Sequence, residues 1–154
     1  APFLPGVTTV FHGDSIACAE LKLYLGAFAF WKNGVRVSPP SQEYFLIDFS
    51  RPETTSFVLQ NSLEVDFDEV SFLIGVDSTL QVDGPHSGPL DPEQGMYWTW
   101  QNGYIYMKME GKSSASADAN HAFAWHLGGY LGTLNAAQEC RFTPCGMSHS
   151  SAHS

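Results

Sequence analysis

Residues 20–31 (ELKLYLGAFAFW) begin with a strict alternation of apolar and polar side chains, which limits the possible folds more than any other feature of the sequence. Leu21 and Leu23 fall on one side of the segment, and Lys22 and Tyr24 fall on the other. A period of two residues is typical of a β-strand whose two faces meet different surroundings. The pattern therefore predicts a strand here, and it fits a helix less well.

Turn signals follow this strand closely. Asn33-Gly34 predicts a two-residue hairpin turn, after which residues 35–37 return as a short strand until Pro39-Pro40 ends it. Gly26 lies inside the long strand, where a glycine indicates a β-bulge or the close approach of a neighbour. Asn102-Gly103 is compatible with either a tight turn or a bulge.

Further segments rich in β-branched and aromatic residues are predicted as strands. They are residues 7–12, 43–49, 57–59, 62–76, 97–110 and 121–130. Residues 83–93 contain two glycines and three prolines, so we expect a long, rigid connection there. Many short strands between Gly/Pro turns predict an all-β fold, a single-domain antiparallel β-sandwich with long Gly/Pro-rich loops. The domain should span residues 1–147, with a flexible Ser/His-rich tail over residues 148–154.

Charge and hydropathy exclude several kinds of partner. The 154-residue chain has a formal net charge of −9 and only seven Lys and Arg, so it should repel nucleic acid and anionic membrane surfaces. No apolar stretch reaches the length of about 20 residues that a transmembrane helix needs. The chain opens on Ala1-Pro2-Phe3 without Met, which we interpret as a secreted or periplasmic protein after signal-peptide removal.

Three cysteines make an odd number of thiols. Cys140 and Cys145 are close enough in sequence to close a small loop, so a Cys140–Cys145 disulfide is predicted for an oxidising compartment. Pairing of Cys18 with either of them is the alternative.

The residues best suited to bind an ion are histidines and acidic side chains. Imidazole is a common ligand of copper, and thioethers suit Cu(I). His126 lies in an apolar segment before two glycines, and His12 ends the first predicted strand. Calcium is a second possibility, because Asp66-x-Asp68 places two carboxylates on one strand face and because Asp77 and Asp91 flank the Gly/Pro-rich connection.

Trp98 and Trp100 share one face of a predicted strand, where packing is the usual role of such residues. A tryptophan beside a redox metal can also be oxidised or relay an electron. No GxSxG, GxGxxG, P-loop or HExxH motif is present. We therefore expect a protein without enzymatic turnover.

An ordered series of motifs resembles the MbnP-like family of periplasmic copper-binding proteins associated with methanobactin operons. The series covers most of residues 19–130, and its best support lies in residues 63–130. The matching elements are Gly75-Val76-Asp77-Ser78, Gly88-x-Leu90-Asp91-Pro92, Gly95-Met96-Tyr97-Trp98-Thr99-Trp100, Gly103-Tyr104-Ile105 and Phe123-x-Trp125-His126-Leu127-Gly128-Gly129.

This resemblance implies a mononuclear copper site built from His and a Trp that a di-haem peroxidase-like partner oxidises to kynurenine. Carried over to this chain, it makes His126 the best ligand candidate and His12 a weaker second. Either Trp98 or Trp100 is the candidate for oxidation. Phe45 stands where the family usually has His, and His86 is a substitute ligand that family members do not offer.

Two hypotheses follow from these observations. The first is a secreted metal-binding protein, with copper as the expected ion. The alternative is a structural protein that self-associates on an MbnP-like scaffold from which the copper site has been lost, because Phe45 removes a ligand and exposed strand edges can pair.

Overall fold

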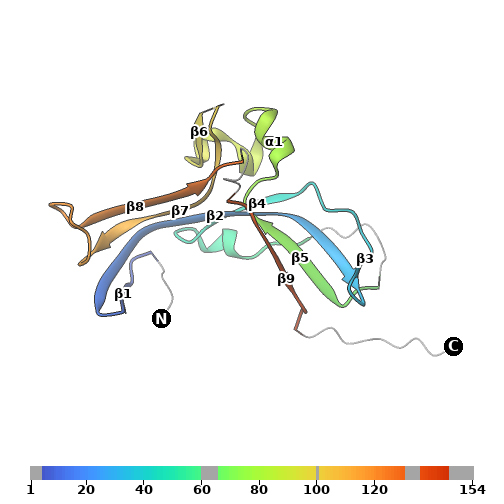
Figure 1. Cartoon of the computed structure of the whole chain (residues 1–154), viewed down its shortest axis with the longest axis horizontal. Helices are drawn as coiled ribbons and strands as arrows, with labels where there is room; N and C mark the ends of the chain where they lie inside the picture. Colours follow the sequence, from blue (N-terminus) through green and yellow to red (C-terminus); the bar gives the residue numbers. More distant parts are fainter. Residues whose placement is uncertain (1–4, 60–65, 100, 131–135, 146–154) are drawn as a thin grey trace.

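Residues 5–59, 66–99, 101–130 and 136–145 are described in this computed structural model (Figure 1). The regular structure of this part of the chain is mainly antiparallel β-sheet, with one five-residue α-helix, so the predicted all-β class is confirmed. The strands are β1 (Thr8–Phe11), β2 (Asp14–Lys32), β3 (Val35–Arg36), β4 (Tyr44–Asp48), β5 (Glu69–Ile74), β6 (Tyr97–Thr99), β7 (Gly103–Ser113), β8 (Ala122–Gly128) and β9 (Gln138–Phe142). The helix is α1 (Ser78–Val82), and the 3-10 turns are η1 (Pro52–Thr55), η2 (Gly88–Leu90) and η3 (Pro92–Gln94).

The 19-residue strand β2 is the centre of the sheet and pairs with β1, β3, β4, β5 and β7. In Figure 1 it runs across the width of the molecule, with β7 and β8 on one limb and β5 and β9 on the other. β8 pairs with β7, and β9 pairs with β5. All sheet pairings thus lead back to β2.

Turn chemistry places the hairpins where the sequence predicts them. Asn33 and Gly34 have φ of 51° and 77°, which are the positive values that a type I′ turn requires. Gln101 and Asn102 lie in a tight turn between β6 and β7, with a hydrogen bond from Asn102 N to Thr99 O. A register shift between Tyr97 and Thr99 accompanies this turn, so the hairpin at Asn102-Gly103 combines a turn with a bulge.

Gly26 shows both features expected of it. The register between β2 and β5 shifts between Gly26 and Ala29, and Ala27 adopts a φ of 49°. A Cβ on Gly26 would lie 2.3 Å from the ring of Tyr44, its partner on β4. The missing side chain therefore makes room for a buried tyrosine.

Replacing Gly26 by Ala is expected to destabilise the protein by about 2 kcal/mol, because overpacking a well-filled core costs about 1–3 kcal/mol. Urea denaturation followed by circular dichroism measures the effect. In the double variant Gly26→Ala/Tyr44→Leu the smaller side chain relieves the overlap, so the two losses should not add. Strict additivity would contradict the steric explanation.

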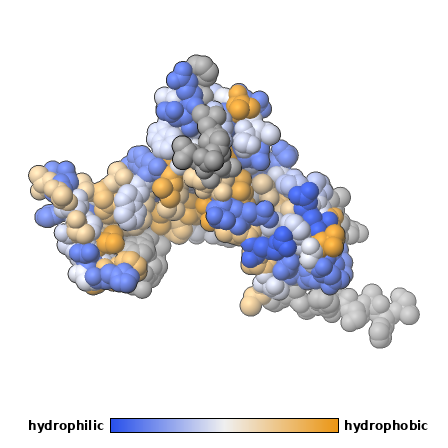
Figure 2. Space-filling view, in the orientation of Figure 1, coloured by the Kyte–Doolittle hydropathy of each residue, from blue (hydrophilic) through white to orange (hydrophobic). Residues whose placement is uncertain are grey.

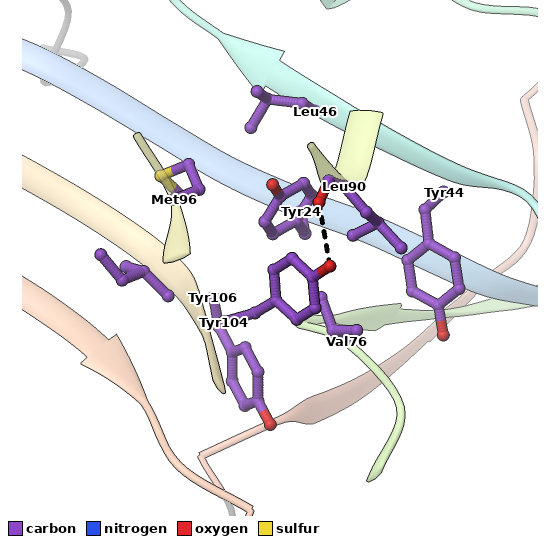
Figure 3. Packing of buried hydrophobic residues seen from close by; sticks show 9 residues of the cluster. Tyr24, Tyr44, Leu46, Val76, Leu90, Met96, Tyr104 and Tyr106 are labelled. Atoms are coloured by element: carbon purple, nitrogen blue, oxygen red, sulfur yellow. Dashed lines mark hydrogen bonds between the residues drawn. The ribbon is translucent and has the colours of Figure 1, made fainter. Parts of the chain in front are cut away.

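The two sides of the central sheet differ in what covers them. We call the side of Tyr24, Tyr104 and Tyr106 the tyrosine face, and the side of Leu21, Leu23, Met107 and Trp125 the leucine face. The buried core lies on or beside the tyrosine face (Figure 3), and its residues are Tyr24, Tyr44, Leu46, Val76, Leu90, Met96, Tyr104, Ile105 and Tyr106.

A cap formed by residues 77–96 covers the tyrosine face. Tyr24 donates its hydroxyl to Pro89 O at 3.0 Å, and Tyr104 donates to Leu90 O at 2.9 Å (Figure 3). Within the cap, Gln81 is fully buried and contacts both neighbouring tyrosines of β7. Hydroxyl-to-backbone bonds thus hold the cap on a floor of tyrosine rings.

The leucine face is less covered by the described residues. Trp125 and Leu127 are 54% and 49% exposed, and Figure 2 shows apolar surface beneath the arch between the two limbs. At the other limb this face carries a cluster of phenylalanine rings, including the stacked pair Phe45 and Phe57 with centroids 4.1 Å apart.

Three expectations need correction. The predicted strand over residues 57–59 is absent, because Pro52 begins the turn η1 and the chain continues without sheet pairing. The described part of residues 62–76 becomes a strand only from Glu69. Strand β9 (Gln138–Phe142) was not expected, because its sequence QECRF has too much charge for an apolar pattern.

Candidate metal site

The imidazole of His126 is held by a carboxylate on the neighbouring strand. His126 Nε2 lies 2.6 Å from Glu110 Oε1, and both side chains are about one-third exposed. A carboxylate oxygen can only accept a hydrogen bond, so Nε2 carries the proton. In the neutral imidazole this leaves the lone pair on Nδ1. A histidine that donates one ring N–H to a carboxylate is the usual arrangement of a metal-binding histidine.

This pair ends a row of charges that crosses four strands of the tyrosine face. The row runs in the order His126, Glu110, Lys108, Glu20, Lys22, Asp48 and Arg51. The successive N–O distances are 2.6, 3.5, 3.0, 2.8, 3.8 and 3.0 Å. Because each side chain contacts the next, the row fixes the position of Glu110 and therefore of His126.

The charges in the row stabilise one another. Partial burial opposes ionisation of Glu20, yet hydrogen bonds from Lys22 and Lys108 hold its pKa below the usual value. Partial burial likewise opposes the charge on Lys108, but the contact with Glu20 raises its pKa. Both groups are therefore charged at neutral pH.

Trp98 lies at the end of the strand that carries His126. A Cβ on Gly128 would lie 2.7 Å from Cζ3 of Trp98, so the indole occupies the space above this glycine. Residues two apart on a strand point to one face and are about 6–7 Å apart. His126 and Gly128 therefore share the tyrosine face, and Trp98 packs over Gly128, two residues along β8 from His126. Trp100 lies outside the described residues.

His12 and His86 are not close to His126. His12 lies in the turn between β1 and β2 with a φ of 50°, and its ring packs edge-on against Phe11. His86 belongs to the cap, where Nε2 bonds Leu80 O at 3.1 Å and the backbone N–H bonds the hydroxyl of Tyr104. Tyr104 lies four residues along β7 from the partner of His126, about 13 Å by strand rise.

Phe45 has a clear place in the structure. Its partner on β2 is Leu25, so its side chain points to the leucine face and stacks on Phe57. His126 points to the tyrosine face, as its contact with Glu110 shows. A histidine at position 45 would therefore lie on the opposite side of the sheet from His126.

The acidic residues considered for calcium have other partners. Asp77 accepts a hydrogen bond from Thr79 N, and Asp91 accepts one from Glu93 N, so both cap short helices. Asp66 forms an ion pair with Lys32 at 3.0 Å. Asp68 accepts a hydrogen bond from Asn33 N.

Cys18, Cys140 and Cys145 are free thiols in the structure, and the Cys140–Cys145 disulfide stays a prediction. Cys18 is buried on the limb of β7, whereas Cys140 lies on β9 at the other limb (Figure 1). This separation disfavours the alternative pairing of Cys18 with Cys140.

Two kinds of feature are absent from the described residues. Over the residues that the structure describes, no three His, Cys, Asp or Glu side chains converge as a ligand group. No described helix is long and apolar enough to cross a membrane. The sequence-predicted ligand for which the structure provides a supporting partner is thus His126, whose ring is hydrogen-bonded to the carboxylate of Glu110.

Comparison with known proteins decides the family. A family model described as MbnP matches residues 2–153, which is nearly the whole chain. The protein belongs to the MbnP family. The solved structure of MbnP from Methylosinus trichosporium is similar, with 16% sequence identity and a TM-score of 0.47. That match covers 75% of this chain and 51% of the other, so this chain spans about half of the length of that protein. No curated protein matches.

Glu110 was not identified from the sequence of this MbnP-family protein. The alternation in β7 places Lys108 and Glu110 on one face, but the contact with His126 depends on the register between β7 and β8, in which Lys108 faces His126. That register was not apparent in the sequence.

Proposed function

We propose that this MbnP-family protein binds a copper ion through His126 and acts without enzymatic turnover. The observation that carries the proposal is the 2.6 Å contact between His126 Nε2 and Glu110, which orients the ring and leaves Nδ1 as the donor atom. Imidazole is a good ligand for copper in both oxidation states, which is the chemistry that this side chain supplies.

Trp98 is the residue that we propose for oxidation. It is 39% exposed, and its ring lies over Gly128 on the same face as His126. A di-haem peroxidase-like partner, as the family resemblance implies, could reach an indole at the surface. Peptide mass spectrometry of the secreted protein would detect the loss of one indole carbon and the gain of one oxygen that convert Trp to kynurenine, and unmodified Trp98 in protein made with such a partner would contradict the assignment. A secreted or periplasmic location is part of the same proposal.

Replacing His126 by Ala is expected to weaken copper binding at least about tenfold, because loss even of an outer-shell partner costs about 10–100-fold in affinity. Glu110→Gln, which loses the charge but keeps the size, should weaken binding within that range. Competition titration with a copper chelator gives the affinities, and elemental analysis gives the amount bound.

The matched control is His12→Asn. Asparagine tolerates the positive φ at this position, so the turn should survive and copper affinity should stay at the wild-type value. Equal affinity of wild type and His126→Ala would contradict the proposed ligand. Wild-type protein that takes up no copper would contradict the proposed function itself.

A further inference from the structure

Strand β8 is an edge of the sheet without the usual protection. Its described pairing is with β7, and its sequence AFAWHLG contains no Lys, Arg, Asp, Glu or Pro. Natural edge strands are commonly protected by charge, proline or a bulge, because their free backbone groups can pair with another strand. The edge strand β9 has such protection, with Glu139 and Arg141 in five residues.

The hydrogen-bond phase of β8 shows which of its backbone groups face outward. Ser113 N donates to His121 O, which makes this pair a hydrogen-bonded one. Hydrogen-bonded pairs alternate along an antiparallel ladder, so Phe123, Trp125 and Leu127 bond β7. The backbone groups of Ala124 and His126 therefore point away from the sheet.

The backbone N–H and C=O of Ala122 support this alternation, because they also point away from β7 and bond to partners outside the sheet. Ala122 N donates to Asp118 Oδ1, and Ala122 O accepts from the hydroxyl of Ser116. The adjacent loop thus caps one end of the edge. Ala124 and His126 form the central outward-facing stretch.

We propose that β8 pairs antiparallel with β8 of a second copy, about a two-fold axis at Trp125. Trp125 is the middle residue of Ala122–Gly128, so this register gives the longest overlap. Ala124 then faces the partner's His126, and His126 faces the partner's Ala124. These two pairs would form about four backbone hydrogen bonds.

The side chains on the leucine face match in this register. Trp125 meets the partner's Trp125, and Phe123 meets the partner's Leu127. Trp125 and Leu127 are half-exposed in one copy, and cross-strand pairs of aromatic and aliphatic residues stabilise sheets by about 0.2–1 kcal/mol each. Pairing would therefore bury apolar surface that the single copy leaves in water.

The charges on the tyrosine face also match. Lys108 faces His126 across β7 and β8, and Glu110 faces Ala124. In the dimer one row across four strands would contain Lys108, His126, the partner's Ala124 and the partner's Glu110. The cationic end of each row thus lies on one copy and the acidic end on the other.

The register has a consequence for the proposed metal site. His126 and the partner's His126 would become diagonal neighbours on one face, about 7–8 Å apart. Two imidazoles at that spacing can bind one ion between them. This consequence rests on the proposed copper function, whereas the strand pairing does not need a metal.

Sedimentation velocity of the metal-free protein tests the pairing, with a dimer expected at twice the 16.9 kDa mass of the chain. Because the chain carries a net charge of −9, we specify 0.15 M salt, at which exposed charges are screened within about 8 Å. Trp125→Lys and Ala124→Pro should each weaken association at least about tenfold, which is 1.4 kcal/mol. Ala124→Pro should leave the fold intact, because proline is tolerated where the N–H points away from the ladder.

The control is Val10→Lys, which adds the same charge at an apolar residue of β1 that is 73% exposed. It should dimerise like the wild type. A wild-type monomer at all concentrations would overturn the proposal, and so would wild-type association of both β8 variants. Copper binding by a monomeric variant would leave the proposed function standing.

Cysteine cross-linking tests the register in a Cys140→Ser/Cys145→Ser background. Trp125→Cys should form an intermolecular disulfide, because non-hydrogen-bonded pairs have Cα atoms about 4.5 Å apart, within the usual disulfide range of about 4.4–6.8 Å. Ala124→Cys should not, because its diagonal neighbour lies beyond that range. The opposite result would overturn the two-fold axis at Trp125.

Discussion

Raising the pH above 10 is expected to unfold the protein steeply, through the buried tyrosines beneath the cap. Burial raises the pKa of Tyr106 to about 12, and burial followed by the nearby Tyr104 and Asp91 raises the pKa of Tyr24 well above its ordinary value. The pKa values of Tyr44 and Tyr104 are also raised by burial. All four hydroxyls therefore stay protonated in the folded protein at pH values where they ionise in the unfolded chain.

The sign of the effect follows from this difference. Each folded pKa lies above its unfolded value, so the stabilisation is complete below pH 10 and is lost as the pH rises toward the folded pKa. Two such groups, Tyr24 and Tyr106, lower the free energy of unfolding by about 3 kcal/mol per pH unit together. That is a large fraction of the roughly 5–15 kcal/mol that stabilises a typical domain.

Circular dichroism and tyrosinate absorbance, recorded together from pH 9 to 12, measure this transition. We expect the tyrosines to ionise together with the loss of sheet signal. Tyr24→Phe keeps the ring but removes one titrating group, so it should make the alkaline transition less steep. Ionisation of all six tyrosines near pH 10 with an intact sheet signal would contradict the prediction.

Replacing Gln81 by Ala is expected to cost about 4 kcal/mol, because it would leave two buried groups without partners and open a cavity. Gln81 is 0% exposed, donates Nε2–H to the hydroxyl of Tyr106 at 2.9 Å and accepts from Tyr104 N at 2.8 Å. These two hydrogen bonds connect helix α1 to strand β7. For a domain of this size, the loss corresponds to a fall in Tm of about 10–15 °C.

Calorimetry of three variants separates the causes. Gln81→Met keeps most of the side-chain volume but loses both hydrogen bonds. Its destabilisation should therefore be more than half of that caused by Gln81→Ala. Val82→Ala, at a neighbouring residue that is 69% exposed, should change Tm little. A loss below about 1 kcal/mol for Gln81→Ala would show that the hydrogen bonds are replaced by water.

Local patterns in the sequence predict the strands of this protein well. The alternation in residues 20–31 identifies β2, and Asn33-Gly34 identifies its hairpin, because strand period and turn type depend on a few adjacent residues. The ends of β2 are less well predicted, since its extension back to Asp14 depends on pairing with β1 and β7. Strand β9 forms because β5 offers it an edge, and QECRF alone does not indicate this.

The sequence does not show which face of β2 carries the deepest core. Leu21 and Leu23 suggest an apolar side, yet the fully buried residue is Tyr24 on the opposite side. The reason is the cap, whose backbone oxygens at Pro89 and Leu90 accept hydrogen bonds from tyrosine hydroxyls. A polar side chain can lie in the core when a loop that is distant in sequence supplies the partner for its hydrogen bond.

The sequence likewise predicts some residues of the candidate site and misses others. His126, and the alternatives Trp98 and Trp100, could be chosen from the family resemblance, and Trp98 packs over Gly128 on the strand that carries His126. Glu110, which orients His126, depends on the register between β7 and β8 and was missed. His12 and His86 are suitable as residue types, but their positions in a turn and in the cap keep them away from His126.

The central position of β2 also affects how fast the chain can fold. β2 is complete at residue 32, but one of its main partners, β7, ends at residue 113, and Ile16 pairs with Ser113. Pairings between residues this far apart make folding slow, because the chain must close long loops before the contacts stabilise it. During synthesis the edge of β2 along residues 16–23, which pairs with β7, is therefore expected to remain unpaired and open to a chaperone or to aggregation until more than two-thirds of the chain has emerged.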